Sequence, residues 1–135
     1  MDPKHYETLY KTEKHHWWYR VRRKIVHNLI NAYADKTKPL KILDVGCGTG
    51  ELLVELSSLG EVFGIDSSPQ AISFSKKRGL KNLSVAKGTE IPFPDNFFNI
   101  VLCLDVLEHI QDDEKTIKEI LRVAKHDAKI IIFVP

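Results

Sequence analysis

The chain has 135 residues, of which 43% are hydrophobic and 28% are charged, and its formal net charge is +2 at pH 7. This length suits one domain, and the composition is that of an ordinary globular protein. No apolar run reaches the roughly 20 residues that a membrane-spanning helix needs, and the first residues lack a signal-peptide core. The two cysteines, Cys47 and Cys103, have no disulfide-framework spacing, so we expect free thiols and a cytoplasmic location. No group of residues has the spacing of a metal site.

The charge is unevenly distributed along the chain. Residues 1–41 hold ten Lys or Arg against four Asp or Glu, a net +6, whereas residues 42–135 carry −4. A basic segment of this kind can meet nucleic acid, but a charge run is more often a solvated helix face, and we favour that interpretation. Because no nucleic-acid-binding motif follows it, nucleic acid is not an expected partner.

The first 40 residues are predicted to form a helical arm. Residues 1–14 are polar with scattered aromatics and no clear period, which indicates a loosely ordered lead-in. From His15 to about Ala34, apolar residues recur at helical spacing and predict a helix with an apolar stripe, made of Trp18, Val21, Ile25 and Leu29 and their neighbours Val26, Ile30 and Tyr33. Its arginines, Arg22 and Arg23, are expected at the surface. Residues 35–40 form a polar linker.

The next ten residues, Lys41 to Gly50, read Lys-Ile-Leu-Asp-Val-Gly-Cys-Gly-Thr-Gly. They predict a buried strand, a turn with glycines at alternate positions, and the start of a helix. Glycines let backbone and ligand approach closely, so this pattern indicates a small-molecule site. A dinucleotide site has the spacing G-x-G-x-x-G, whereas the third glycine here comes one position early, and Asp44 would repel a pyrophosphate.

A second carboxylate, Asp66, ends the apolar run 62–65, twenty residues after Gly46. At the tip of the neighbouring strand it is placed to accept hydrogen bonds from both ribose hydroxyls. Asp44 suits a positive charge or N–H donors. Together the two carboxylates imply a nucleoside that carries a cationic, amino-acid-like tail.

Helical and strand patterns alternate through the rest of the chain. We expect helices over about residues 52–59, 69–78 and 112–125, and strands at 62–65, 83–86, 99–104 and 129–134. In the last helix the residues expected to face inward are Ile117, Ile120, Leu121 and Ala124, and residues 126–128 are expected to form a turn. Five strands that alternate with helices predict a parallel α/β sheet with right-handed crossovers.

Several motifs now stand in a fixed order: residues 44–50, Asp66, Ile91-Pro-Phe-Pro-Asp95 and Asp105-Val-Leu-Glu-His109. In this combination residues 41–135 resemble the class I S-adenosylmethionine-dependent methyltransferases, above all the small-molecule, type 11/12-like branch. The resemblance implies a Rossmann-like three-layer sandwich with strand order 3-2-1-4-5, S-adenosylmethionine as cofactor and S-adenosylhomocysteine as product. The family fold continues through two further strands, so we expect residues 1–40 to be an arm and residues 41–135 a truncated core. The free edge of the fifth strand then favours self-association.

The resemblance also implies roles for single residues. Asp44 would hold the α-amino group of the methionine moiety, Asp66 the ribose, and the backbone at Leu104 and Asp105 would line the tail and the methyl. Where the family usually has an acid after the loop glycine, Thr89 follows Gly88, so adenine recognition is expected to fall to Thr89, Glu90 and backbone groups around Ile91. The predicted cofactor-binding set is Asp44, Gly46, Cys47, Gly48, Asp66, Ser67, Thr89, Glu90, Ile91, Leu104 and Asp105.

In the family an N-terminal helix lies over the cofactor cleft, and an aromatic or arginine there can contact the methionine end. For this chain we expect instead that Trp18 lies in the core. Methyl transfer from a sulfonium does not demand a dedicated catalytic side chain. Asp105 and His109 are candidates for a base, with the equal alternative that Glu108 and His109 begin or cap the next helix.

The expected function is methyl transfer to a small-molecule acceptor. Two alternatives from other classes remain open at this point. One is an NAD-type dinucleotide-binding domain, which the glycine spacing and Asp44 disfavour. The other is a non-catalytic module that binds the cofactor, or nothing, and acts through a partner.

Overall fold

Five parallel strands in the order β3-β2-β1-β4-β5 form the sheet of the computed structural model, which describes residues 2–134. The strands are β1 (Lys41–Val45), β2 (Glu61–Asp66), β3 (Leu83–Val85), β4 (Phe98–Leu104) and β5 (Ala124–Phe133). Every neighbouring pair runs parallel. The predicted parallel α/β sheet and its strand order are therefore confirmed.

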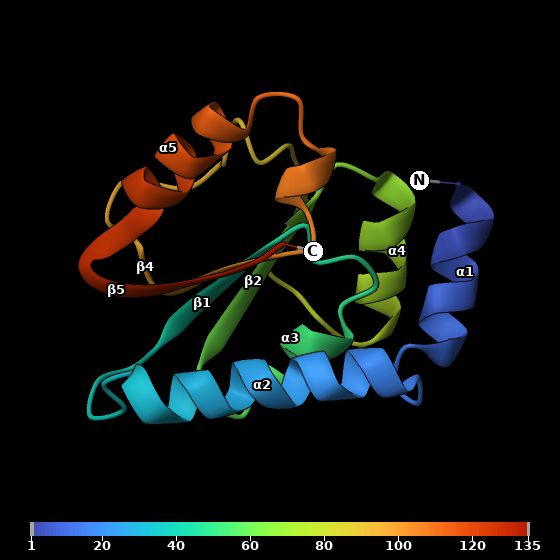
Figure 1. Ribbon diagram of the computed structural model, residues 1–135, viewed down its shortest axis with the longest axis horizontal. Helices are drawn as coiled ribbons and strands as arrows, with labels where there is room; N and C mark the ends of the chain where they lie inside the picture. The colour runs from blue at the N-terminus through green and yellow to red at the C-terminus, as the bar shows by residue number, and fades with distance from the viewer. Residues whose placement is uncertain (1, 135) are drawn as a thin grey trace.

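Helices cover both faces of this sheet (Figure 1). One face carries α2 (Trp17–Tyr33), α3 (Glu51–Leu56) and α4 (Pro69–Lys77), and the other carries α5 (Asp113–Val123). The first helix, α1 (Pro3–Thr12), stands alongside α4, and a short 3₁₀ helix, η1 (Leu107–His109), links β4 to α5. Within residues 2–134 no helix combines the length and the apolar content that crossing a bilayer requires.

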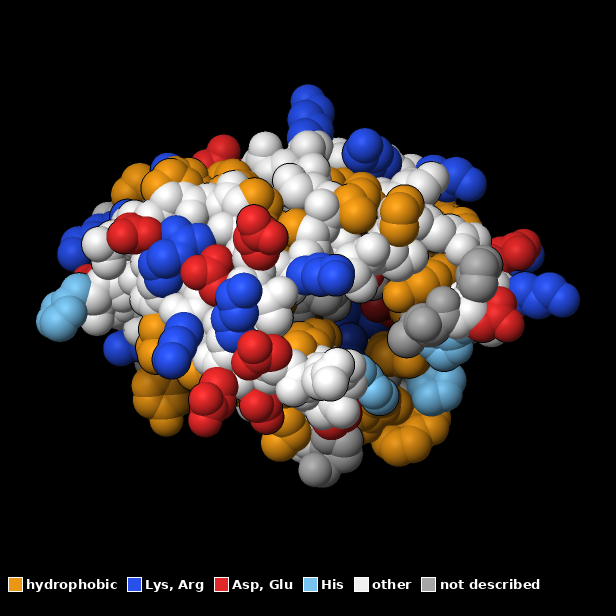
Figure 2. Space-filling view, turned by 90° about the horizontal axis from the view of Figure 1, so that it is seen from above, with side chains coloured by type: hydrophobic (Ala, Val, Ile, Leu, Met, Phe, Trp, Pro, Cys, Tyr) orange, Lys and Arg blue, Asp and Glu red, His pale blue; other side chains and the backbone are white. Residues whose placement is uncertain are grey.

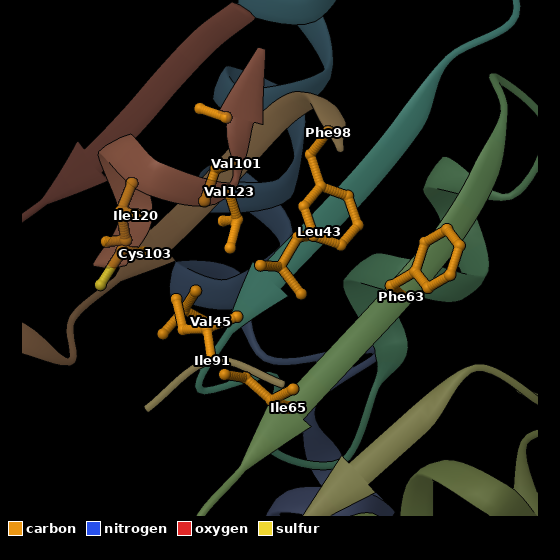
Figure 3. Packing of buried hydrophobic residues seen from close by; sticks show 11 residues of the cluster. Leu43, Val45, Phe63, Ile65, Ile91, Phe98, Val101, Cys103, Ile120 and Val123 are labelled. Atoms are coloured by element: carbon orange, nitrogen blue, oxygen red, sulfur yellow. The ribbon is translucent and has the colours of Figure 1, made fainter. Parts of the chain in front are cut away.

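Alternating side chains divide the core between the two faces. Leu43 and Val45 of β1 pack with Ile120 and Val123 of α5, as Figure 3 shows. Ile42, which precedes Leu43, packs on the opposite face, in the cluster to which α2 and α3 contribute. Because successive strand residues point to opposite faces, Asp44 belongs to the α2 side of the sheet.

The N-terminal segment is a helix, so the prediction of a loosely ordered lead-in is wrong for the described residues 2–14. Asp2 caps α1, because its Oδ1 accepts a hydrogen bond from the backbone N–H of Lys4 at 2.9 Å. Pro3 occupies the first helical turn, where its missing N–H costs nothing. An Asp-Pro pair is a helix-start signal, and it stands in the sequence at residues 2 and 3.

The helix predicted from His15 to about Ala34 is confirmed as α2, but of its predicted apolar stripe only Val26 and Ile30 are buried. The buried residues are Arg23, Val26 and Ile30, whereas Trp18 is 39% exposed and so does not lie in the core. Of the predicted stripe, Val21 and Ile25 are likewise exposed and Leu29 is only half-buried. The cause is Arg23, whose Nη1 and Nη2 donate to the carbonyls of Glu13 and Lys14, both at 2.9 Å. These bonds hold the end of α1 and turn the arginine inward, so the prediction that it is a surface residue is also wrong.

The last helix and strand show two similar differences. In α5 the buried residues are Thr116, Ile120 and Val123, while Ile117 is 39% and Leu121 59% exposed, so these two do not face inward. The predicted turn at residues 126–128 is absent from the structure, because β5 begins at Ala124, directly after α5. Ala124 pairs with Phe98 and Lys129 with Ile100, so the intervening residues 125–128 are accommodated as a bulge.

Candidate functional site

A cavity of about 1350 Å³ opens at the carboxyl ends of β1, β2 and β4. Its other walls come from α1, from the first turns of α2 and from residues 105–112, which connect β4 to α5. Figure 2 shows the surface hollowed near the centre of one face, with acidic, histidine and hydrophobic side chains around the hollow. Ligands of open parallel sheets gather at such a point, where the strand order reverses next to β1.

The glycine turn after β1 forms one wall of the cavity. Gly46 and Gly48 have φ values of +78° and +57°, in the region that favours glycine. A Cβ atom at Gly46 would lie 2.5 Å from Cγ2 of Val106, so the chain itself already fills that space. A Cβ atom at Gly48 would meet only Cδ2 of Leu9, at 3.8 Å. The turn therefore presents bare backbone to the cavity at Gly48.

Asp66 ends β2 and is turned toward this glycine turn. Its Oδ2 accepts from the N–H of Gly48, and its Oδ1 accepts from the N–H of Ser68, both at 2.9 Å. The side chain is 8% exposed and lines the cavity together with Ser67. Each carboxylate oxygen can accept a further hydrogen bond, so both remain available to the hydroxyls of a ligand.

Asp44 and Arg22 lie next to the cavity with unsatisfied polar atoms. Oδ1 of Asp44 and Nε of Arg22 are buried and lack a hydrogen-bond partner among the described residues. Burial raises the pKa of Asp44 to about 7, an effect that the nearby guanidinium of Arg22 opposes and the carboxylate of Asp66 reinforces. Leaving a buried donor and a buried acceptor unpaired is costly. A ligand that carries both an ammonium and a carboxylate group would satisfy both atoms.

Asp105 follows β4 and joins Arg22 at the wall of the cavity. Its Oδ2 accepts from Nη1 of Arg22 at 2.8 Å, and its backbone N–H donates to the carbonyl of Phe133 at 2.9 Å. Its φ is +55°, a left-handed conformation that is uncommon for a residue other than glycine. Such strain clusters at functional sites, because the surrounding contacts must hold it in place.

Arg78 fixes α1 against the glycine turn. Its guanidinium donates to the carbonyls of Thr49 at 2.7 Å and Tyr10 at 3.0 Å, and it pairs with the carboxylate of Glu51 at 2.8 Å. Glu13, just after α1, lies 3.5 Å from the same guanidinium and accepts a short hydrogen bond from the hydroxyl of Thr49. These bonds hold α1 over the cavity, which is lined by four residues of this segment, namely His5, Tyr6, Leu9 and Glu13.

Most of the predicted cofactor residues meet at this cavity. Those that line it are Gly46, Cys47, Gly48, Asp66, Ser67, Thr89, Leu104 and Asp105. Asp44 lies directly behind this lining, at 4% exposure. The sequence analysis did not predict α1, although Asp2-Pro3 at its start is a helix-start signal. Trp18 and Arg22 of α2, expected in the core and at the surface, also line the cavity.

Two residues of the predicted set, Glu90 and Ile91, do not line the cavity. Glu90 is exposed. The backbone of Ile91 is already occupied, because its N–H donates to Oε2 of Glu119 and its carbonyl accepts from Nη2 of Arg122, each at 2.8 Å. The loop after β3 thus lines the cavity through residues 86–89, whereas Ile91 is bonded to α5.

The two candidate bases lie at different depths. Asp105 is half-buried with its carboxylate on Arg22. The side chain of His109 is 75% exposed, and its Nε2 lies 3.5 Å from Oε1 of Glu108. Glu108 and His109 both belong to η1 and line the cavity.

Comparison with known proteins identifies the family. A methyltransferase domain matches residues 43–132 of the chain. An ajmaline N-methyltransferase from Rauvolfia serpentina is 36% identical over 104 residues, which are 70% of this chain and 36% of that enzyme. The curated relatives are longer, since the chain spans between 36% and 57% of their lengths.

Solved structures agree with this match. A methyltransferase from Aquifex aeolicus that depends on S-adenosylmethionine has a TM-score of 0.68 at 26% identity, over 93% of this chain and 68% of that one. The PH0226 protein from Pyrococcus horikoshii has a TM-score of 0.74 at 28% identity, over 87% and 58% of the two chains. Nothing among these matches favours a dinucleotide-binding domain. The chain belongs to the class I S-adenosylmethionine-dependent methyltransferase family, whose cofactor is S-adenosylmethionine.

Proposed function

We propose that this chain binds S-adenosylmethionine in the cavity and supplies the cofactor-binding part of an enzyme that methylates a small molecule. The observation that carries the proposal is the pair of buried, unpartnered atoms on Asp44 and Arg22 beside the glycine turn. Their opposite charges fit the ammonium and the carboxylate of an amino-acid tail. In this arrangement residues 41–135 are the core, and residues 1–40 are an arm that covers the cavity.

The other residues of the cavity fit the rest of the cofactor. Asp66 accepts from the ribose hydroxyls, and Gly48 allows the ligand to lie against the backbone. Ser67 and Thr89 lie at the adenine end, where the hydroxyl of Thr89 is a hydrogen-bonding group for the base. The backbone of Leu104 and Asp105 borders the methionine end.

The bound cofactor supplies an electrophilic methyl group on a sulfonium. The residues of this chain hold the donor and the acceptor in line and keep water away from them, which is the main requirement of the reaction. Asp105 and His109 remain our candidates for a base, needed only if the acceptor must lose a proton. Arg22 orients the carboxylate of Asp105 toward α2.

A small-molecule acceptor is supported by the size of the cavity and by the Rauvolfia relative, whose named substrate is ajmaline. A cytoplasmic location is supported by Cys47 and Cys103, which are both buried and free. We do not expect nucleic acid as a partner, because Arg22 and Arg23 of the basic arm are bonded within the protein.

Titration calorimetry with S-adenosylhomocysteine and, separately, with NAD tests the proposal. We expect binding of S-adenosylhomocysteine and none of NAD. NAD binding without S-adenosylhomocysteine binding would overturn the proposal. Binding of S-adenosylhomocysteine without methylation of any compound in a broad small-molecule panel would favour the non-catalytic alternative.

A further inference from the structure

The cavity has a second region that the cofactor residues leave free. It is bounded by Trp18 of α2 and by Glu108, His109, Ile110 and Asp112 of the segment between β4 and α5, and we call it the acceptor region. The proposed cofactor residues lie at the ends of β1, β2 and β3 and, with Leu104 and Asp105, at the end of β4, and the acceptor region follows Asp105 along the chain. A volume of about 1350 Å³ exceeds the range of roughly 300–1000 Å³ in which one drug-sized ligand binds. The cavity thus has room for a second molecule beside the cofactor.

The acceptor region carries a surplus of negative charge. Glu108 and Asp112 each have a carboxylate there, and no Lys or Arg among residues 2–134 lies within ion-pair distance of either one. The two cationic residues in the cavity lining do not pair with them. Arg22 pairs with Asp105 at 2.8 Å, and Lys87, which follows β3, forms an ion pair with neither Glu108 nor Asp112. Oδ1 of Asp112 accepts from the backbone N–H of Lys115 at 3.1 Å and caps α5, so a cation bound in the acceptor region would chiefly meet the carboxylate of Glu108, which has no Lys or Arg partner.

An aromatic surface completes the acceptor region. Trp18 is 39% exposed and lines the cavity, and no cation of the described residues lies over its ring. The ring of the next residue, Tyr19, already has the guanidinium of Arg22 at 5.2 Å from its centroid. An aromatic face beside carboxylates is the arrangement that recognises ammonium groups, through cation–π attraction and charge pairing.

Resting on the proposed function, we propose that the methyl acceptor is an amine on an apolar ring system, held between Trp18 and Glu108. The amine arrives as an ammonium and loses its proton to the adjacent carboxylate or to water. Its lone pair then forms the new N–C bond while the C–S bond breaks and its electron pair stays on sulfur. The positive charge moves from sulfur to nitrogen, so nearby carboxylates stabilise the product side of the reaction. A phenolate or carboxylate acceptor would instead bring a negative charge next to Glu108 and Asp112.

Binding of three matched probes tests this inference, each added to protein saturated with S-adenosylhomocysteine. The amine 1,2,3,4-tetrahydroisoquinoline is compared with isochroman, in which oxygen replaces the nitrogen, and with the acid 2-naphthoate. We expect the amine to bind at least about tenfold more tightly than isochroman, the scale of an ion pair plus a cation–π contact, and the acid to bind most weakly. Equal affinities, or tighter binding of the acid, would overturn the inference.

Two variants locate the effect. Glu108→Gln is expected to weaken tetrahydroisoquinoline binding at least about fivefold while isochroman affinity stays unchanged. Asp113→Asn is the matched control, because it removes the same charge from an exposed position at the start of α5, outside the cavity lining. Equal effects of the two variants would overturn the site, since they would indicate only long-range attraction. Failure of the wild-type chain to bind S-adenosylhomocysteine would instead refute the proposed function, and the two failures are therefore distinguishable.

Discussion

At the scale of single residues, the proposed role of Asp44 predicts that cofactor binding depends on pH. Burial raises its pKa to about 7 in the ligand-free protein, so at pH 6 most molecules carry the neutral acid. Binding an ammonium requires the carboxylate, so protonation competes with binding. We expect affinity for S-adenosylhomocysteine to be about tenfold lower at pH 6 than at pH 8, which follows from a pKa near 7. Calorimetry across this range measures the change in affinity, and binding at pH 7 should release about half a proton per ligand bound.

The matched variant for this prediction is Asp44→Asn. It is expected to bind S-adenosylhomocysteine more weakly at pH 8 and to lose the dependence between pH 6 and pH 8. Burial also raises the pKa of Glu13, another carboxyl of the cavity, although the hydroxyl of Thr49 and nearby arginines oppose that rise. If Asp44→Asn retained the full pH dependence, the titrating group would be Glu13 or another residue, and the role of Asp44 would be refuted.

Alanine substitutions at two glycines can distinguish the effect of backbone strain on stability from the effect of ligand contact on binding. Gly48 and Gly79 both have positive φ, at +57° and +93°, and a Cβ atom would meet little at either one. Alanine at each is therefore expected to lower the free energy of unfolding by a similar amount, about 1–2 kcal/mol. Only Gly48→Ala should weaken S-adenosylhomocysteine binding, because only Gly48 lines the cavity. Urea denaturation and calorimetry on both variants check this, and equal losses of binding would contradict it.

At the scale of elements, the sequence predicted the parts of the site that local motifs encode. Asp44 and Asp66 stand at strand ends, and the glycine turn between them follows from its own spacing. The buried face of α2 was harder to predict, because an arginine such as Arg23 is usually exposed to solvent. It is buried only because its guanidinium finds the carbonyls at the end of α1. Such a contact joins two elements and leaves no periodic signal in either one, so the prediction for α2 found Val26 and Ile30 but missed the burial of Arg23.

The attachment of α1 depends mainly on Arg78. Its side chain is 13% exposed, and the side chains of Glu51 and Glu13 are 8% and 6% exposed. Removing the guanidinium leaves two buried carboxylates without their cation. We expect Arg78→Met to lower the free energy of unfolding by about 3–5 kcal/mol, the usual cost of breaking a buried pair. Urea denaturation measures this, and hydrogen exchange should be faster in residues 3–12 than in the wild type.

An exposed ion pair at the same junction serves as the control. Arg23 pairs with Glu55 at 3.1 Å, but the side chain of Glu55 is 41% exposed. Glu55→Gln is expected to cost less than about 1 kcal/mol, because solvent screens the lost charge. Should Arg78→Met cost no more than Glu55→Gln, the attachment of α1 would have to come from apolar packing instead.

At the scale of the whole molecule, the alternation of elements predicted a parallel sheet with right-handed crossovers, and the strand order followed from the family resemblance. The start of β5 and its bulge could not be predicted from the sequence. A strand that starts directly after α5 needs a bulge at residues 125–128 to restore its register with β4, and no turn residue announces it. The edges of the sheet also depend on the whole fold, because an edge strand is one that has a single neighbouring strand.

The outer edge of β5 predicts how the molecule associates. Among the described residues β5 pairs only with β4, so its other side presents unpaired backbone groups, and Ile132 on it is 39% exposed. We expect reversible self-association, seen as a sedimentation coefficient that rises with protein concentration. Ile132→Lys should abolish the rise, because an edge lysine opposes strand pairing. Ile117→Lys is the control, since Ile117 is equally exposed at 39% but lies on α5. A concentration-independent coefficient, or the same effect from both variants, would show that this edge does not mediate association.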